Sequence, residues 1–135
     1  MTEEYLEEIG DYMNSPVLSI DSELTVQEAA QQMHAKNVGS LLVRVFKKYV
    51  GILTETDLTR KVVAKGLNPE TTMVSLVMSK PVCSMDRYMP AEEAEEFMKR
   101  KNIRHLAVTE ADEIVGMLSV KDLVSCYSKS FRMVE

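Results

Sequence analysis

The stretch GILTETDLTR (51–60) recurs farther along the chain as GMLSVKDLVS (116–125). Both copies follow the pattern Gly-x-Leu-[Thr/Ser]-x-x-Asp-Leu. In each copy, apolar residues typical of a strand lead to a hydroxyl residue and an aspartate, which are common at the start of a helix. The recurrence of a whole strand-to-helix junction indicates that the chain contains one structural unit twice.

The duplication extends over most of the chain at a constant offset of 65 positions, which carries Gly51 to Gly116. Residues 13–62 align with residues 78–127 without a gap, and 17 of the 50 aligned pairs are identical, far more than chance would give. We therefore divide the chain into an N-terminal helix over 1–12, repeat 1 over 13–66, a linker and connecting helix over 67–77, and repeat 2 over 78–135.

Each repeat predicts the element order β-α-β-β-α. Short extended runs at 16–20 and 81–85 precede helices at 25–37 and 90–101, whose apolar residues recur at helical spacing. Two strands follow, at 40–46 and 49–54 in repeat 1 and at 105–110 and 114–119 in repeat 2, each pair joined by a polar turn. A last helix runs from about 55 to 65 and ends at Gly66, and its counterpart begins near Val120. The predicted fold class is α+β.

The composition excludes several classes of protein. The chain has 135 residues and a formal net charge of -5, whereas a nucleic-acid-binding protein usually carries a basic face. No apolar run approaches the roughly 18–20 residues that span a bilayer, and the acidic N-terminus is the reverse of a secretory signal. The two cysteines and two histidines are scattered and lack the spacing of zinc ligands. We expect a cytoplasmic protein without a metal, a nucleic-acid partner or a membrane partner.

The repeated junction has two interpretations that the sequence leaves open. Thr54 with Asp57, like Ser119 with Asp122, matches a capping box that only stabilises a helix start. The same junction offers free backbone N–H groups and a positive helix end, where a hydroxyl can meet a phosphate and an aspartate can accept from ribose hydroxyls. The glycine in each copy marks either a β-bulge or a close backbone approach.

Further paired stretches surround these junctions. DYMNSPV (11–17) and LVMSKPV (76–82) precede the first strands, and NVGSLLV (37–43) and NIRHLAV (102–108) lead into the hairpins. With the two junctions and the element order, the chain from about Asp11 to Tyr127 resembles a stand-alone tandem pair of CBS domains, a Bateman module. The resemblance implies two repeats packed about a pseudo-twofold axis, with clefts between them that bind AMP, ADP, ATP, NAD or S-adenosylmethionine. It also implies that modules pair as a homodimer and that a packing change is read by a regulated partner, here unknown.

The resemblance also assigns roles to residues. It implies that Asp57 and Asp122 hold ribose, that Thr54 and Ser119 meet phosphate, that Pro16, Val17, Pro81 and Val82 lie near the base, and that Val38 and Ile103 wall it in. The repeats differ where Gly39, Ser40 and Thr56 are replaced by Arg104, His105 and Lys121. In the family such positions lie near the phosphates and tend to serve the cleft of the opposite unit's aspartate. We therefore expect the Asp57 cleft to be the better phosphate site.

Two other classes of function compete with nucleotide sensing. A ligand-free dimerisation or interaction module would use the repeated junction only as a helix cap. An enzyme would need a nucleophile with a base, paired carboxylates or a metal, and the sequence offers no such set. We expect a regulatory binding module with no catalytic residues and no cofactor other than an adenosine ligand.

Overall fold

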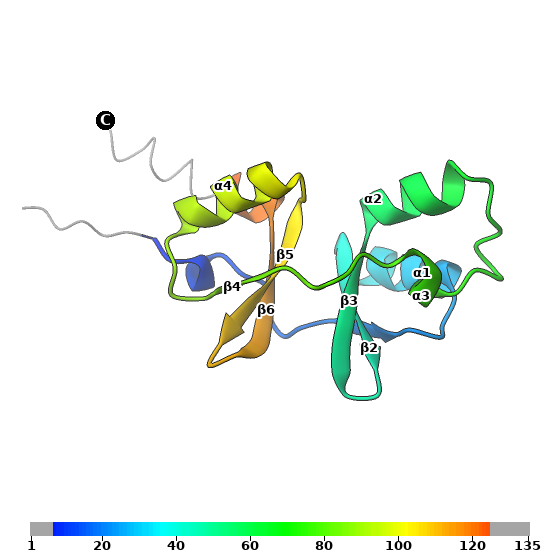
Figure 1. The fold of residues 1–135 in the computed structure, drawn as a ribbon, viewed down its shortest axis with the longest axis horizontal. Helices are drawn as coiled ribbons and strands as arrows, with labels where there is room; N and C mark the ends of the chain where they lie inside the picture. The colour runs from blue at the N-terminus through cyan, green and yellow to red at the C-terminus, as the bar shows by residue number, and fades with distance from the viewer. Residues whose placement is uncertain (1–6, 125–135) are drawn as a thin grey trace, which may run out of the picture. The chain divides into compact units, whose positions relative to one another are not determined.

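The computed structural model describes residues 7–124, whose helices and strands belong to two compact units (Figure 1). The continuous unit is Leu18–Val82, and the discontinuous unit combines Met1–Val17 with Cys83–Glu135. Each unit contains a three-stranded sheet accompanied by helices. The predicted α+β class and the two-fold repetition are confirmed.

The continuous unit follows the predicted order. It contains β1 (Ser19–Asp21), α1 (Val26–Lys36), β2 (Ser40–Val45), β3 (Lys48–Thr54), α2 (Glu55–Asp57), the π-helical segment η2 (Leu58–Val63) and α3 (Val74–Val77). Strand β2 lies between β1, which is parallel to it, and β3, which is antiparallel. Its core joins sheet residues such as Leu41 and Leu53 to Ala29 and Met33 of α1, all of them buried.

The discontinuous unit repeats this arrangement. It contains the 3-10 segment η1 (Ile9–Asp11), β4 (Ser84–Asp86), α4 (Ala91–Lys101), β5 (His105–Glu110), β6 (Glu113–Ser119) and the 3-10 segment η3 (Val120–Leu123). Strand β5 is parallel to β4 and antiparallel to β6. Leu106 and Leu118 of the sheet pack with Ala94 and Met98 of α4, and these side chains are buried.

The helix ends agree with their local sequence signals. Thr25 and Glu28 form the predicted capping box at the start of α1. Asn37 and Asn102 end α1 and α4 in the left-handed conformation at φ 58, which asparagine tolerates better than most residues. Gly66 also has a positive φ, 71, as expected of a residue that ends a helix. The helix over 90–101 begins one residue later than predicted, because Pro90 is its N-cap.

The helix expected over 1–12 is not an α-helix in its described part. Residues 1–6 lie outside the described residues, and residues 7–12 contain only the single turn η1. The backbone N–H groups of Ile9 and Gly10 donate to the carbonyls of Met89 and Arg87, so they are used between segments rather than along a helix. The last helix of repeat 2, predicted from near Val120, begins as the 3-10 segment η3, and residues 125–135 lie outside the described residues.

In each unit, the last strand of one repeat pairs with the first residues of the other repeat, which lie before that repeat's first strand. Ile52 of β3 exchanges two backbone hydrogen bonds with Ser79, both at 2.9 Å, and Met117 of β6 exchanges two with Asn14, at 2.8 and 3.0 Å. Ser79 precedes the first strand of repeat 2, and Asn14 precedes that of repeat 1. The boundaries of the compact units therefore do not follow the boundaries of the repeats in sequence.

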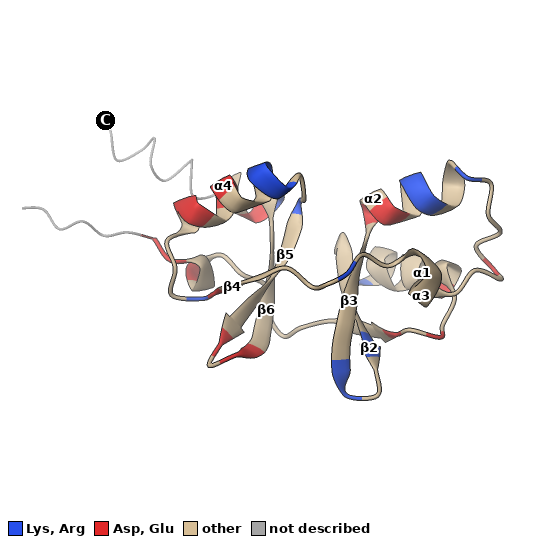
Figure 2. Ribbon diagram, viewed as in Figure 1, with Lys and Arg blue, Asp and Glu red and all other residues tan. Residues whose placement is uncertain are grey.

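The two repeats carry opposite charges at their hairpin turns. Lys47 and Lys48 lie at the turn between β2 and β3, whereas Glu110, Asp112 and Glu113 surround the turn between β5 and β6 (Figure 2). The two repeats therefore share the same core arrangement but differ in the charge of their hairpin turns. Within residues 7–124, we find no helix with the length and apolar character to cross a membrane.

The glycine of each repeated junction serves both roles that the sequence left open. Val43 is paired with Gly51 and Arg44 with Tyr49, so that Val50 is the extra residue of a β-bulge. A Cβ atom on Gly51 would lie 2.8 Å from Met78 Sδ and 2.9 Å from the Ser79 carbonyl oxygen. A side chain at this position would therefore push away the segment that pairs with β3.

We predict that Gly51→Ala destabilises the fold, by about 1–3 kcal/mol as expected for overpacking. Urea denaturation followed by circular dichroism measures this loss. The matched control is Gly66→Asn, because a Cβ at Gly66 meets nothing within 4 Å and asparagine tolerates its positive φ. A Gly51→Ala variant as stable as the control would show that the backbone approach is not restrictive.

Candidate functional site

The repeated junctions are capping boxes in the structure. Thr54 ends β3, its Oγ1 accepts from the backbone N–H of Asp57 at 3.2 Å, and Asp57 Oδ2 accepts from the backbone N–H of Thr54 at 3.0 Å. Ser119 and Asp122 repeat this reciprocal pair at 3.3 and 2.8 Å. The predicted capping boxes are present at both junctions, and whether the junctions also bind a ligand stays a prediction.

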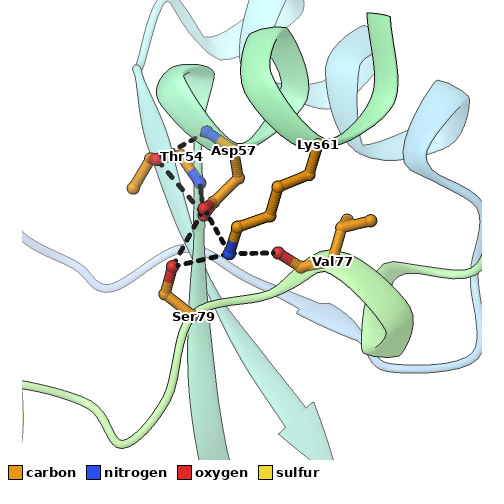
Figure 3. Close-up of polar contacts among 5 residues, drawn as sticks. All are labelled: Thr54, Asp57, Lys61, Val77 and Ser79. Carbon is orange, nitrogen blue, oxygen red and sulfur yellow. Dashed lines mark hydrogen bonds and ion pairs between the residues drawn. The ribbon is translucent and has the colours of Figure 1, made fainter. Parts of the chain in front are cut away.

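Asp57 is held by more than its cap (Figure 3). Its Oδ1 accepts a hydrogen bond from Ser79 Oγ at 2.9 Å and forms an ion pair with Lys61 Nζ at 3.0 Å. Lys61 Nζ also donates to the Val77 carbonyl at 3.1 Å and to Ser79 Oγ at 3.3 Å. Both oxygens of this buried carboxylate are therefore engaged by residues of the continuous unit.

Asp122 is held differently. Its Oδ2 accepts from the backbone N–H and the hydroxyl of Ser119, and also from Asn14 Nδ2 at 2.9 Å. Asn14 occupies the position equivalent to Ser79, whereas the position equivalent to Lys61 is Cys126, which lies outside the described residues. Among residues 7–124, no hydrogen bond or ion pair reaches Asp122 Oδ1. The two aspartates share a cap but not the groups that surround their carboxylates.

Each of the two proline–valine segments lies in the same compact unit as one of the two aspartates. Pro81 and Val82 follow Ser79 in the continuous unit, which contains Asp57. Pro16 and Val17 follow Asn14 in the discontinuous unit, which contains Asp122. The peptide bonds before both prolines are cis. The first residues of each repeat belong to the compact unit that contains most of the other repeat. Each proline segment therefore lies in the same unit as the aspartate of the other repeat.

The remaining predicted residues lie around the helix starts. The carbonyl of Gly39 accepts from the N–H of Glu55, as that of Arg104 does from Val120, so the first residues of β2 and β5 lie beside the junctions. Val38 and Ile103 are half-buried against their cores. The Arg104 and Lys121 side chains are exposed, His105 is half-buried at the start of β5, and Ser40 is buried. Arg104, His105 and Lys121 all belong to the discontinuous unit, and their contact with a ligand at Asp57 stays a prediction.

Sequence reasoning missed three residues that touch the aspartates: Lys61, Ser79 and Asn14. Lys61 had a local signal, because it lies four positions after Asp57, the spacing at which opposite charges meet on a helix. Ser79 and Asn14 had none, since they lie 22 and 108 positions from their aspartates. In the described part of the chain, no three His, Cys, Asp or Glu side chains are grouped to hold a metal ion.

We predict that Asp57→Ala destabilises the fold more than Asp122→Ala does. The first change removes bonds from the Thr54 cap, Ser79 and Lys61, and a hydrogen bond to a charged group is typically worth about 1.5–3 kcal/mol. The second removes the bonds from Ser119 to the carboxylate and one amide contact, and it keeps the cap bond from the Asp122 backbone N–H to Ser119 Oγ. Urea denaturation of the two variants tests this order, and equal losses would show that Lys61 and Ser79 contribute no more stability than Asn14 does.

Comparison with known proteins gives consistent matches. A family model described as CBS domain matches residues 9–64 and again residues 74–129. An uncharacterized protein of Methanopyrus kandleri is 30% identical over 118 residues, which are 86% of this chain, and the chain spans 60% of that protein's length. A CBS domain-containing protein of Bacillus subtilis is 32% identical over 115 residues, covering 85% of this chain and 81% of that protein.

A solved structure agrees with the sequence matches. The hexameric CBS-CP12 protein from bloom-forming cyanobacteria is similar in fold, with a TM-score of 0.83 and 28% sequence identity. The similarity covers 90% of this chain and 72% of that chain. Both the duplication and the order of elements within each unit are therefore shared with proteins of known fold.

Proposed function

Because this chain belongs to the CBS-domain family, as a tandem pair of its units, we propose that it is a regulatory module that binds an adenosine compound such as AMP. The observation that carries the proposal is the pair of equivalent strand-to-helix junctions, each with an aspartate fixed at the first turn of a helical segment. The positive end of a helical segment favours a phosphate there, and a carboxylate accepts from ribose hydroxyls.

The proposal gives each predicted residue a role. Asp57 and Asp122 accept from ribose, and segments that lead into or out of the junctions contact the rest of the ligand. The phosphate contacts are Thr54, Ser119, Arg104, His105 and Lys121, and the contacts near the base are Pro16, Val17, Pro81, Val82, Val38 and Ile103. Occupancy would change the packing of the units and so signal to a regulated partner.

One observation favours a second function, a ligand-free interaction module. Asp57 already has both oxygens engaged by the cap, Ser79 and Lys61, so its carboxylate is satisfied within the protein. In that case the repeated junctions would serve stability alone. The two functions differ in whether any adenosine compound stabilises the fold.

We predict that at least one of AMP, ADP, ATP, NAD and S-adenosylmethionine raises the melting temperature in a thermal-shift panel. A ligand at about 100 times its dissociation constant adds about 2.7 kcal/mol to the free energy of unfolding. The double variant Asp57→Ala, Asp122→Ala should lose this response, and guanosine monophosphate serves as the ligand control. A flat response of the parent chain to every adenosine compound would favour the interaction module.

We also propose that the chain assembles as a homodimer. The cyanobacterial CBS-CP12 relative is hexameric, and this chain exposes the apolar side chains of Val63 and Leu76 by 75% and 71%. Both belong to helical segments of the continuous unit, where a second chain could cover them.

Sedimentation velocity at micromolar concentration should therefore show a dimer. Val63→Glu with Leu76→Glu should shift the population toward monomer, since a buried charge opposes association. Lys65→Glu on the same unit is the control for a change of charge alone. A parent chain that sediments as a monomer would contradict the homodimer.

A further inference from the structure

Lys61 forms an ion pair with the carboxylate of Asp57. The lysine side chain is 42% exposed, whereas that of Asp57 is only 6% exposed, so the ammonium reaches from the surface to a buried anion. Lys61 Nζ lies 3.0 Å from Asp57 Oδ1 and also donates to the Val77 carbonyl and to Ser79 Oγ (Figure 3). The lysine is therefore fixed by three acceptors around the atom that a ribose would need.

The acceptor capacity of Asp57 is fully used. A carboxylate offers about four lone-pair positions, and four donors reach this one. Oδ2 accepts from the backbone N–H and the hydroxyl of Thr54, and Oδ1 faces Ser79 Oγ and Lys61 Nζ. A ribose that binds here through its hydroxyls must replace two of these donors.

The donors that can leave are Ser79 and Lys61. The Thr54 backbone is fixed by the strand-to-helix junction, and its hydroxyl also accepts from the Asp57 N–H as part of the cap. Ser79 and Lys61 approach Oδ1 from outside this turn, and the lysine has a long, flexible side chain. Binding of a ribose at Asp57 therefore separates the ammonium from the carboxylate.

The cost of this separation depends on the charge of the ligand. An uncharged nucleoside leaves the buried carboxylate with neutral donors only, and a buried charge that loses its charged partner is unfavourable. A ligand that carries a phosphate offers the released ammonium a new anion. Repeat 2 lacks such a lysine in its sequence, because Cys126 stands at the equivalent position.

We propose that Lys61 is a specificity-determining residue that makes the Asp57 site accept phosphorylated adenosine compounds and reject uncharged nucleosides. This role rests on the proposed function, since it requires that the ligand's ribose meet Asp57. It differs between the repeats, because Asp122 is approached by the uncharged amide of Asn14.

The test uses the Asp122→Ala chain, in which Asp57 is the remaining ribose aspartate. Isothermal titration should show that AMP binds at least about tenfold more tightly than adenosine, a difference of about 1.4 kcal/mol. Lys61→Met, which keeps a long unbranched side chain without charge, should strengthen adenosine binding, weaken AMP binding and bring the two affinities together. Lys65→Met is the matched control, and it should leave the ratio unchanged because Lys65 is an exposed lysine four positions farther on.

A labelling experiment tests the same role without a substitution at Lys61. In the ligand-free Asp122→Ala chain, Lys61 should react more slowly than Lys65 with an amine-directed reagent, as read by peptide mass spectrometry. Saturation with adenosine should raise the reactivity of Lys61, and saturation with AMP should leave it low, since the ammonium moves to the phosphate.

The outcomes separate this role from the proposed function. Binding of both compounds with the same affinity ratio in Lys61→Met as in its background, or a Lys61 reactivity that adenosine does not change, would overturn the role of Lys61 alone. Failure of every adenosine compound to bind the parent chain would overturn the proposed function, and the role of Lys61 with it.

Discussion

The structure depends on a short backbone pairing between the last strand of each repeat and the first residues of the other repeat, ahead of its first strand. Ile52 pairs with Ser79, and Met117 pairs with Asn14. The absence of a side chain at Gly51 and Gly116 makes this approach possible, because a Cβ at either position would lie within 3.0 Å of a carbonyl oxygen of the pairing segment. The pairing then brings Ser79 and Asn14 against the two aspartates, so the fold constraint also builds the candidate sites.

Duplication of the backbone has not made the two carboxylates chemically equal. The capping geometry is the same at Asp57 and Asp122, since it depends only on the local sequence of the junction. The groups that arrive from elsewhere differ, namely a hydroxyl and an ammonium at Asp57 and an amide at Asp122. A charged partner on a buried acid changes the free energy of any event that separates them, whereas an amide has a smaller effect.

The sequence predicted the parts of the molecule that depend on neighbours along the chain. The capping boxes, the left-handed turn at Gly66 and the order of elements in each repeat all follow from local patterns. The helix expected before residue 13 illustrates the limit, because its amphipathic pattern did not show that Ile9 and Gly10 would bond to Met89 and Arg87. The contact of Asn14 with Asp122 could not be predicted either, because no rule of local spacing links residues 108 positions apart.

The pairing of each repeat's first residues with the other repeat also determines the order in which the two units can form during synthesis. The continuous unit ends at Val82, so every residue that it needs has left the ribosome before repeat 2 is complete. The segment around Asn14 emerges before the continuous unit but finds its backbone partner only when Met117 has been made. This segment therefore waits until repeat 2 is almost complete, and its closure onto β6 is a contact of high sequence separation, the kind that slows folding.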